Sequence, residues 1–206
     1  MTAVRNEVSG DMDFLWEFCM KKTLCVLALF SALIIHIYAF GGMEFSVGSG
    51  YVFYGNKETR ERNSSLTSPG QFILNTSVGY HFPLADPVRL YLGAEGMFDF
   101  RWDGGKHIHM FDYTGLLGFQ IYPGLAGLMI SIDYALGRRS DYVDLTGNDA
   151  YWDSTPWGNG FKIGIQYDFL HGRSKFSPVA GVSWRRMPRG DGADNILSVF
   201  LKLTIN

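Results

Sequence analysis

The feature that most constrains the fold of this chain is a set of eight segments in which apolar and polar residues alternate. Alternation with a period of two indicates strands that have two unlike faces. Each segment has about 9–15 residues, enough to cross a bilayer at the usual tilt, whereas soluble strands average about five or six. The sequence therefore predicts an all-β fold, an eight-stranded antiparallel up-and-down transmembrane β-barrel. The segments are Met43–Tyr54, Gln71–Phe82, Val88–Trp102, His109–Tyr122, Leu128–Gly137, Phe161–Phe169, Ser177–Arg186 and Ile196–Ile205.

The apolar face of these segments is predicted to point outward, toward lipid. Its aromatic residues gather near the strand ends and its aliphatic residues near the middle, which is typical of a membrane barrel with two interfacial girdles. A soluble lipocalin-like barrel has the opposite orientation, with an apolar interior. The polar face would then line the lumen, where its charges of both signs can pair. The charged residues of this face are Arg89, Glu95, Asp99, Arg101, Asp133, Lys162, Asp168, Arg185 and Lys202.

The segment before the barrel has the layout of a signal peptide. Lys21 and Lys22 precede the apolar run Leu24–Ile37, and the small residue Ala39 follows. Four acidic residues before Met20 are unusual for an exported chain, so the first residues are interpreted as a mis-annotated extension. The alternative is a single membrane anchor formed by Leu24–Phe40. The predicted division is residues 1–19 as the extension, 20–39 as the signal peptide and 40–206 as the outer-membrane barrel.

Composition narrows the possible functions. The formal net charge is −2 and no basic stripe is present, so nucleic acid is not an expected partner. Both cysteines, Cys19 and Cys25, lie in the segment predicted to be removed, so disulfides and cysteine metal sites are excluded from the mature chain. No cofactor and no metal site is expected. Because a closed barrel leaves no free strand edge, we expect a monomer.

The connections between segments alternate in length. The longer ones fall on one side, which predicts that they are extracellular and that both termini are periplasmic, in the outer membrane of a diderm bacterium. Outer-membrane lipid and the barrel-insertion machinery are then the expected partners. The long connections are Gly55–Gly70, Asp103–Ile108, Arg138–Gly160 and Met187–Asn195, and the short ones are Pro83–Pro87, Pro123–Gly127 and Leu170–Phe176.

This layout resembles the OmpW family and its relatives among small, porin-like outer-membrane proteins. The resemblance covers residues 40–206 and rests on strand number, loop alternation and the export signal that begins at Met20. It implies a narrow pore or passive carrier for small, hydrophobic solutes, with a lateral exit. Inward apolar residues could form the binding pocket, although such residues more often serve as lumen packing, which is the favoured interpretation. They are Tyr91, Met97, Leu116, Met129 and Phe200, and with the lumen charges they are the candidate binding residues.

Two other functions stay open at this stage. In the first, the barrel is a structural or adhesion platform, and aromatic residues of the longest loop bind a host surface ligand or fold onto the rim. These residues are Tyr142, Tyr151, Trp152 and Trp157. In the second, the protein modifies lipids, using His107, His109 and Asp112 with Ser140 and Asp141 across the next connection. No nucleophile or metal motif accompanies those residues, so we predict that the protein is not an enzyme.

Overall fold

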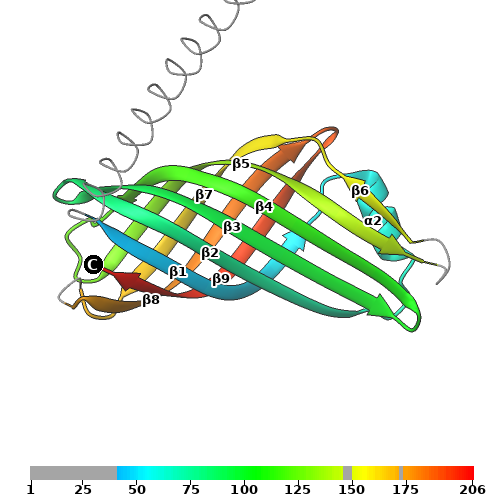
Figure 1. Ribbon diagram of the computed structural model, residues 1–206, viewed down its shortest axis with the longest axis horizontal. Coiled ribbons are helices and arrows are strands. Elements are labelled where there is room, and N and C mark those ends of the chain that lie inside the picture. Colours follow the sequence, from blue (N-terminus) through cyan, green and yellow to red (C-terminus); the bar gives the residue numbers. More distant parts are fainter. Residues whose placement is uncertain (1–40, 146–149, 172–173) are drawn as a thin grey trace, which may run out of the picture. The chain divides into compact units, whose positions relative to one another are not determined.

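The computed structural model describes residues 41–145, 150–171 and 174–206. The predicted extension, residues 1–19, and the predicted signal peptide, residues 20–39, lie outside the described residues. Nine strands and one short helix, α2 (Lys57–Ser64), make up the described part (Figure 1). The strands are β1 (Gly42–Phe53), β2 (Gly70–Ala85), β3 (Val88–Asp103), β4 (Lys106–Ile121), β5 (Leu128–Asp144), β6 (Tyr151–Ser154), β7 (Gly158–Asp168), β8 (Phe176–Arg189) and β9 (Gly192–Ile205).

Eight of the nine strands close into a barrel, as the sequence predicts. The strand order is β4-β3-β2-β1-β9-β8-β7-β5-β6, and the pairing of β4 with β5 completes the ring. Every neighbouring pair is antiparallel, and each of the eight predicted segments matches one barrel strand to within a few residues at most ends. Figure 1 shows α2 and β6 at the same end of the barrel, called here the upper end.

The prediction that Arg138–Gly160 is one long loop is wrong. β5 continues through its first half to Asp144, and β6 then pairs with residues Ser140–Val143 of β5. The period of two persists in this extension, but Arg138 and Ser140 are outward and Arg139 and Asp141 are inward. Because both faces are polar there, the contrast that reveals a membrane strand disappears from the sequence.

Two further predicted long connections are also wrong. Asp103–Ile108 reduces to the two-residue turn Gly104-Gly105, and Met187–Asn195 reduces to Gly190-Asp191. Gly104 has φ of 60° and Gly190 has φ of 55°, the left-handed conformation that two-residue hairpin turns require and glycine adopts without strain. The upper end therefore carries two long connections and two tight hairpins rather than four loops.

The connection Gly55–Gly70 contains α2, which the sequence analysis did not anticipate. Asn56 caps the helix, because its Oδ1 accepts a hydrogen bond from the backbone N–H of Thr59 at 3.2 Å. Leu66, just after the helix, is buried in an apolar cluster with Val52 and Tyr54 of the β1 end. The helix is thereby attached to the upper end of the barrel.

The predicted orientation of the two faces is confirmed. Val199 and Leu201, outward on β9, are 62% and 65% exposed, whereas Met97 and Arg185, inward on β3 and β8, are 0% and 1% exposed. Charged residues are buried inside the barrel and large apolar residues are exposed outside it. This is the inverse of a lipocalin-like barrel, so the soluble alternative is wrong.

Candidate functional site

The lower half of the lumen is organised around Glu44 of β1. Lys202 Nζ donates a hydrogen bond to Glu44 Oε2 at 2.8 Å, and Gln120 Nε2 donates to both carboxylate oxygens at 3.0 and 3.1 Å. His81 Nδ1 lies 3.2 Å from Glu44 Oε1, and Arg89 Nη1 lies 3.3 Å from His81 Nε2. These contacts join five strands across the barrel, so the lower lumen is crossed by hydrogen-bonded side chains.

A chain of alternating charges runs from the middle of the lumen to its upper end. Glu95 pairs with Lys162 and lies 3.4 Å from Arg185. Arg185 then pairs with Asp112 at 2.9 Å, and Asp112 pairs with Arg189 at 2.6 Å. All five side chains are buried or nearly so. In a medium of low polarity such charges are tolerated only when each has a partner, and here every member is paired.

The upper continuation of this chain includes residues that the sequence analysis placed in loops. Asp194 accepts hydrogen bonds from Arg189 at 2.9 Å and from Arg139 at 2.6 Å. Arg139 also donates to Asp141 at 2.7 Å and to Thr59 Oγ1 of α2 at 2.8 Å. Arg139 thus ties three elements, β5, β9 and α2, across the upper mouth.

Tyr54 and Asp99 close the remaining side of the mouth. Tyr54 Oη donates a hydrogen bond to Asp99 Oδ2 at 2.7 Å, and Arg101 Nη2 donates to the same oxygen at 2.8 Å. The Arg139 guanidinium stacks over the Tyr54 ring at 4.7 Å from its centre. Apolar side chains, among them Met97 and Met110 at 0% exposure, fill the space below. The upper mouth is therefore closed by packed side chains and by α2.

A polar cavity lies among the lumen side chains of the described barrel. Counted as the space open to the centre of a water molecule, its volume is about 30 Å³, enough for roughly two waters. Glu95, Lys162 and Lys202 line it, and Asp133 Oδ1 and Gln166 Oε1 have no hydrogen-bond partner among the described residues. Buried polar atoms of this kind are usually satisfied by ordered water. A solute larger than a few waters does not fit this space.

The structure places the sequence-predicted lumen residues inside the barrel, but in separate groups. Asp168 lies at the lower end, where it accepts a hydrogen bond from Ser177. Tyr91 and Phe200 line the central cavity, whereas Met97 is packed in the upper apolar cluster. The other predicted members, Arg89, Glu95, Asp99, Arg101, Met129, Asp133, Lys162, Arg185 and Lys202, are buried or half-buried within the wall. They line the lumen in several groups and do not form one ligand pocket.

Ion pairing also attaches α2 to β6. Arg62 Nη2 donates a hydrogen bond to Asp153 Oδ2 at 2.6 Å, and this bond holds the pKa of Asp153 below its ordinary value of 3.8. A carboxyl whose pKa is lowered by folding contributes stability above its unfolded pKa and loses it as the pH falls through the folded pKa. The α2–β6 contact is therefore expected to weaken only below pH 3.8.

We expect Arg62→Ala to raise the pKa of Asp153 toward 3.8, as measured by NMR titration of the carboxyl carbon. Lys57→Ala is the control, because the Lys57–Glu61 pair lies on the same helix but is 82% and 66% exposed. A pKa that is the same in wild type and Arg62→Ala would show that the Arg62–Asp153 bond does not form in solution.

Of the aromatic residues predicted for loop recognition, Tyr142 and Trp152 lie on the outer side of the β5–β6 hairpin, whereas Tyr151 pairs in register with the inward-facing Val143. The rings of Tyr142 and Trp152 are 5.4 Å apart, and the Trp157 ring lies 6.4 Å from that of Tyr113 on β4. Tyr151, Trp152 and Trp157 are 48%, 63% and 61% exposed. Tyr142, Trp152 and Trp157 continue the outer face of the barrel, and the four residues do not form one loop surface.

The residues considered for catalysis do not assemble. His107 and His109 are on the outer face, where their rings are 5.8 Å apart, while Asp112 is buried in the lumen against Arg185 and Arg189. Ser140 faces outward and shares a hydrogen bond with Ser154, whereas Asp141 faces inward and accepts a hydrogen bond from Arg139. The wall of the barrel therefore separates the histidines from both carboxylates. Among the described residues, no group of three or more His, Cys, Asp or Glu side chains could hold a metal ion.

No helix in the described parts of the chain is long and apolar enough to cross a membrane.

Comparison with known proteins supports the fold. No family description and no curated sequence matches the chain. Among solved structures, the attachment invasion locus protein Ail of Yersinia pestis is 9% identical, with a TM-score of 0.53, and the match covers 80% of this chain and 97% of Ail. Ail in complex with the heparin analogue sucrose octasulfate gives 9% identity, the same coverage and a TM-score of 0.50.

Neisserial surface protein A is 12% identical over 79% of this chain and 95% of that protein, with a TM-score of 0.49. Identities this low show a shared fold alone. The chain has the fold of small eight-stranded outer-membrane β-barrels.

Proposed function

We propose that this protein is an outer-membrane barrel with a closed lumen, which acts through the outer surface of the barrel and its upper end. The observation that carries the proposal is the buried charge chain from Lys162 to Asp141, with the mouth above it closed by Tyr54, Arg139 and α2. Eight strands enclose a space that side chains largely fill. A barrel filled in this way serves as a rigid anchor for what its surface presents.

An outer-membrane location accounts for the apolar exterior. Large side chains such as Val199, Leu201 and Ile165 are more than half exposed on the outer wall, which would be an aggregation hazard in water. Lipid is the solvent that such a wall fits, and a closed barrel satisfies every backbone hydrogen bond within it. The name of the structural neighbour Ail, an attachment invasion locus protein, is consistent with a role at the cell surface.

The function implied by the OmpW resemblance, a narrow pore or carrier for small hydrophobic solutes, is the finer alternative. It would need a lumen space open to an apolar solute. The inward apolar residues Leu116 and Met129 are 2% and 1% exposed, so their surfaces are covered by neighbouring side chains. The one central cavity described above is lined mainly by polar side chains. The filled lumen therefore favours the surface role.

We expect the folded protein to give no open-channel current in planar bilayers and no swelling of solute-loaded proteoliposomes. The reason is that the Glu44 contacts cross the lower lumen and the charge chain crosses its middle and upper part. Folding is verified in the same sample by the shift in gel mobility on boiling. Steady conductance or uptake of small hydrophobic probes by the folded form would favour the pore instead. Surface proteolysis of intact cells at residues 55–69 supplies the second test, because the proposal places α2 outside.

A further inference from the structure

A single row of aromatic rings crosses the outer face of five adjacent strands. Phe72, Phe100, His109, Tyr142 and Trp152 are direct register partners from β2 to β6, and they are called here the aromatic row. The centres of successive rings are 6.4, 5.2, 5.8 and 5.4 Å apart. Each contact is within the range of favourable ring–ring packing, so the row is a continuous surface.

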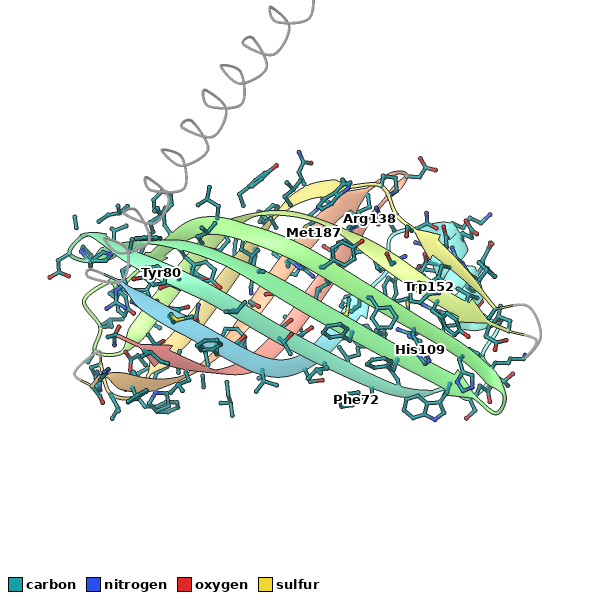
Figure 2. The ribbon with its side chains drawn as sticks, in the orientation of Figure 1. Phe72, Tyr80, His109, Arg138, Trp152 and Met187 are labelled. Carbon is teal, nitrogen blue, oxygen red and sulfur yellow. The ribbon has the colours of Figure 1, made fainter. Side chains whose placement is uncertain are left out.

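The two ends of the row are exposed. Phe72 is 54% and Trp152 is 63% exposed. Phe111 supports the row from one side, since its ring lies 5.9 Å from that of Phe100 and 5.7 Å from that of Trp152. In Figure 2, Phe72, His109 and Trp152 follow one another along one flank of the barrel toward the upper end. The surface is thus fixed by the sheet beneath it and open to what lies beside the barrel.

The row does not run parallel to the membrane. Register partners lie perpendicular to the strands, and barrel strands tilt by roughly 35–45° from the membrane normal. Four steps of about 4.8 Å make a row about 19 Å long, which rises by about 12 Å from Phe72 to Trp152 at that tilt. Phe72 is an outward aromatic residue near the upper end of β2 and thus part of the upper girdle, so Trp152 stands about 12 Å above the level of Phe72.

A phospholipid headgroup layer does not cover that height. The polar region of an ordinary leaflet is about 5–8 Å thick. The His109, Tyr142 and Trp152 end of the row would then stand in water, although it faces sideways along the membrane. A headgroup built of several sugars is taller, and sugar rings offer C–H faces for packing on aromatic rings together with hydroxyls for the polar atoms of His, Tyr and Trp. This matches the row in height and in chemistry.

A positive charge lies below Tyr142 on the same outward face of β5, four residues away along the strand. Arg138 faces outward on β5, opposite Tyr113 of β4 in the register, and no ion pair to it is found among the described residues. Arginine on the outer wall next to an aromatic girdle is suited to bind phosphate or carboxylate groups. The bound headgroup is therefore expected to be anionic.

We propose that the aromatic row, with Arg138, binds the anionic saccharide headgroup of a glycolipid in the outer leaflet, whose acyl chains pack on the apolar wall below. The proposal rests on the proposed outer-membrane function, and it names the partner of the outer surface. The occupied surface is continuous with the lipid-facing wall, so a single molecule contacts both. Tyr142, at the centre of the upper part of the row, is the predicted main contact.

The test uses two full-length variants in which Trp152 or Trp184 is the only tryptophan. Each is folded into phosphatidylcholine vesicles with and without lipopolysaccharide. Trp184 packs edge-to-face on Phe161 at 5.3 Å on the opposite flank and serves as the matched control. We expect lipopolysaccharide to shift Trp152 emission to shorter wavelength and to protect it from iodide, with no change at Trp184. Tyr142→Ala should weaken the apparent lipopolysaccharide affinity about tenfold, the usual loss for a central aromatic contact.

The possible failures are distinguishable. Brominated acyl chains should quench Trp184 in both vesicle types; if they do not, the barrel is not inserted and the proposed function fails. If Trp184 is quenched but Trp152 does not respond to lipopolysaccharide, the glycolipid proposal alone is wrong. A response of Trp152 to the free core oligosaccharide as strong as to lipopolysaccharide would also contradict it, since the ligand would then be a soluble sugar.

Discussion

Arg185→Ala is expected to destabilise the folded barrel by about 3–5 kcal/mol, because it removes one of the two cationic partners from each of two buried carboxylates. Arg185 is 1% exposed and contacts Glu95, Asp112 and Thr114 from one position on β8. Asp112 would keep Arg189, and Glu95 would keep Lys162, but both would lose the charge that joins the two halves of the chain. The measurement is the free energy of unfolding in urea, followed by tryptophan fluorescence in phospholipid vesicles.

The adjacent residue provides the matched control for this prediction. Arg186 has the same side chain on the same strand, but it faces outward, is exposed and pairs with Asn195 in the register. Arg186→Ala should change the free energy of unfolding by less than about 1 kcal/mol, as surface substitutions usually do. Equal losses for the two variants would mean that the charge chain does not hold the barrel together.

The second large effect is expected on the opposite face. Val199→Arg should lower the free energy of unfolding by about 2–4 kcal/mol, because it places a charged guanidinium in the hydrocarbon at the bilayer midplane. Val199 is 62% exposed and pairs with Ser49, between the outward aromatic residues Phe45 and Tyr51 near the two ends of β1. In a water-exposed barrel the same change would replace an apolar surface residue by a charged one, and the free energy of unfolding would change little. Unfolding in urea and the yield of heat-modifiable protein both report the effect.

Asn195→Arg is the depth control for Val199→Arg. It lies on the same strand and the same face, opposite Phe53 near the upper end. An arginine near the interface costs only about 0–1 kcal/mol. A depth-independent loss, or no loss at Val199, would contradict the assignment of the outer wall to lipid.

The wall of the barrel could be predicted from the sequence because residues that face lipid and residues that face the lumen alternate along a membrane strand and differ in polarity. The prediction was wrong where that contrast ends. Arg138 and Arg139 are neighbours of like chemistry on opposite faces, so the extension of β5 looked like a loop. The glycines of the Gly104-Gly105 and Gly190-Asp191 turns carried a signal for tight hairpins that the pattern analysis did not use.

The sequence predicted which residues face the lumen, but it did not predict which of them contact one another. Alternation identifies Lys202 as inward, and it also places Glu44 on the polar face, but the two are 158 positions apart and only barrel closure joins them. Asp194 and Arg189 were assigned to a loop, so the upper half of the charge chain was missed. The aromatic row was not predicted because it depends on the register of five strands, which local patterns do not fix.

Flotation of the folded chain with phospholipid vesicles tests the central claim, an apolar wall around a charged interior, most directly. The chain is diluted from urea with and without vesicles, separated on a density gradient and analysed for heat-modifiable gel mobility. Our account predicts compact, heat-modifiable protein only in the vesicle fraction and aggregates in its absence. A monodisperse, compact species that stays at the bottom of the gradient without lipid or detergent would contradict it.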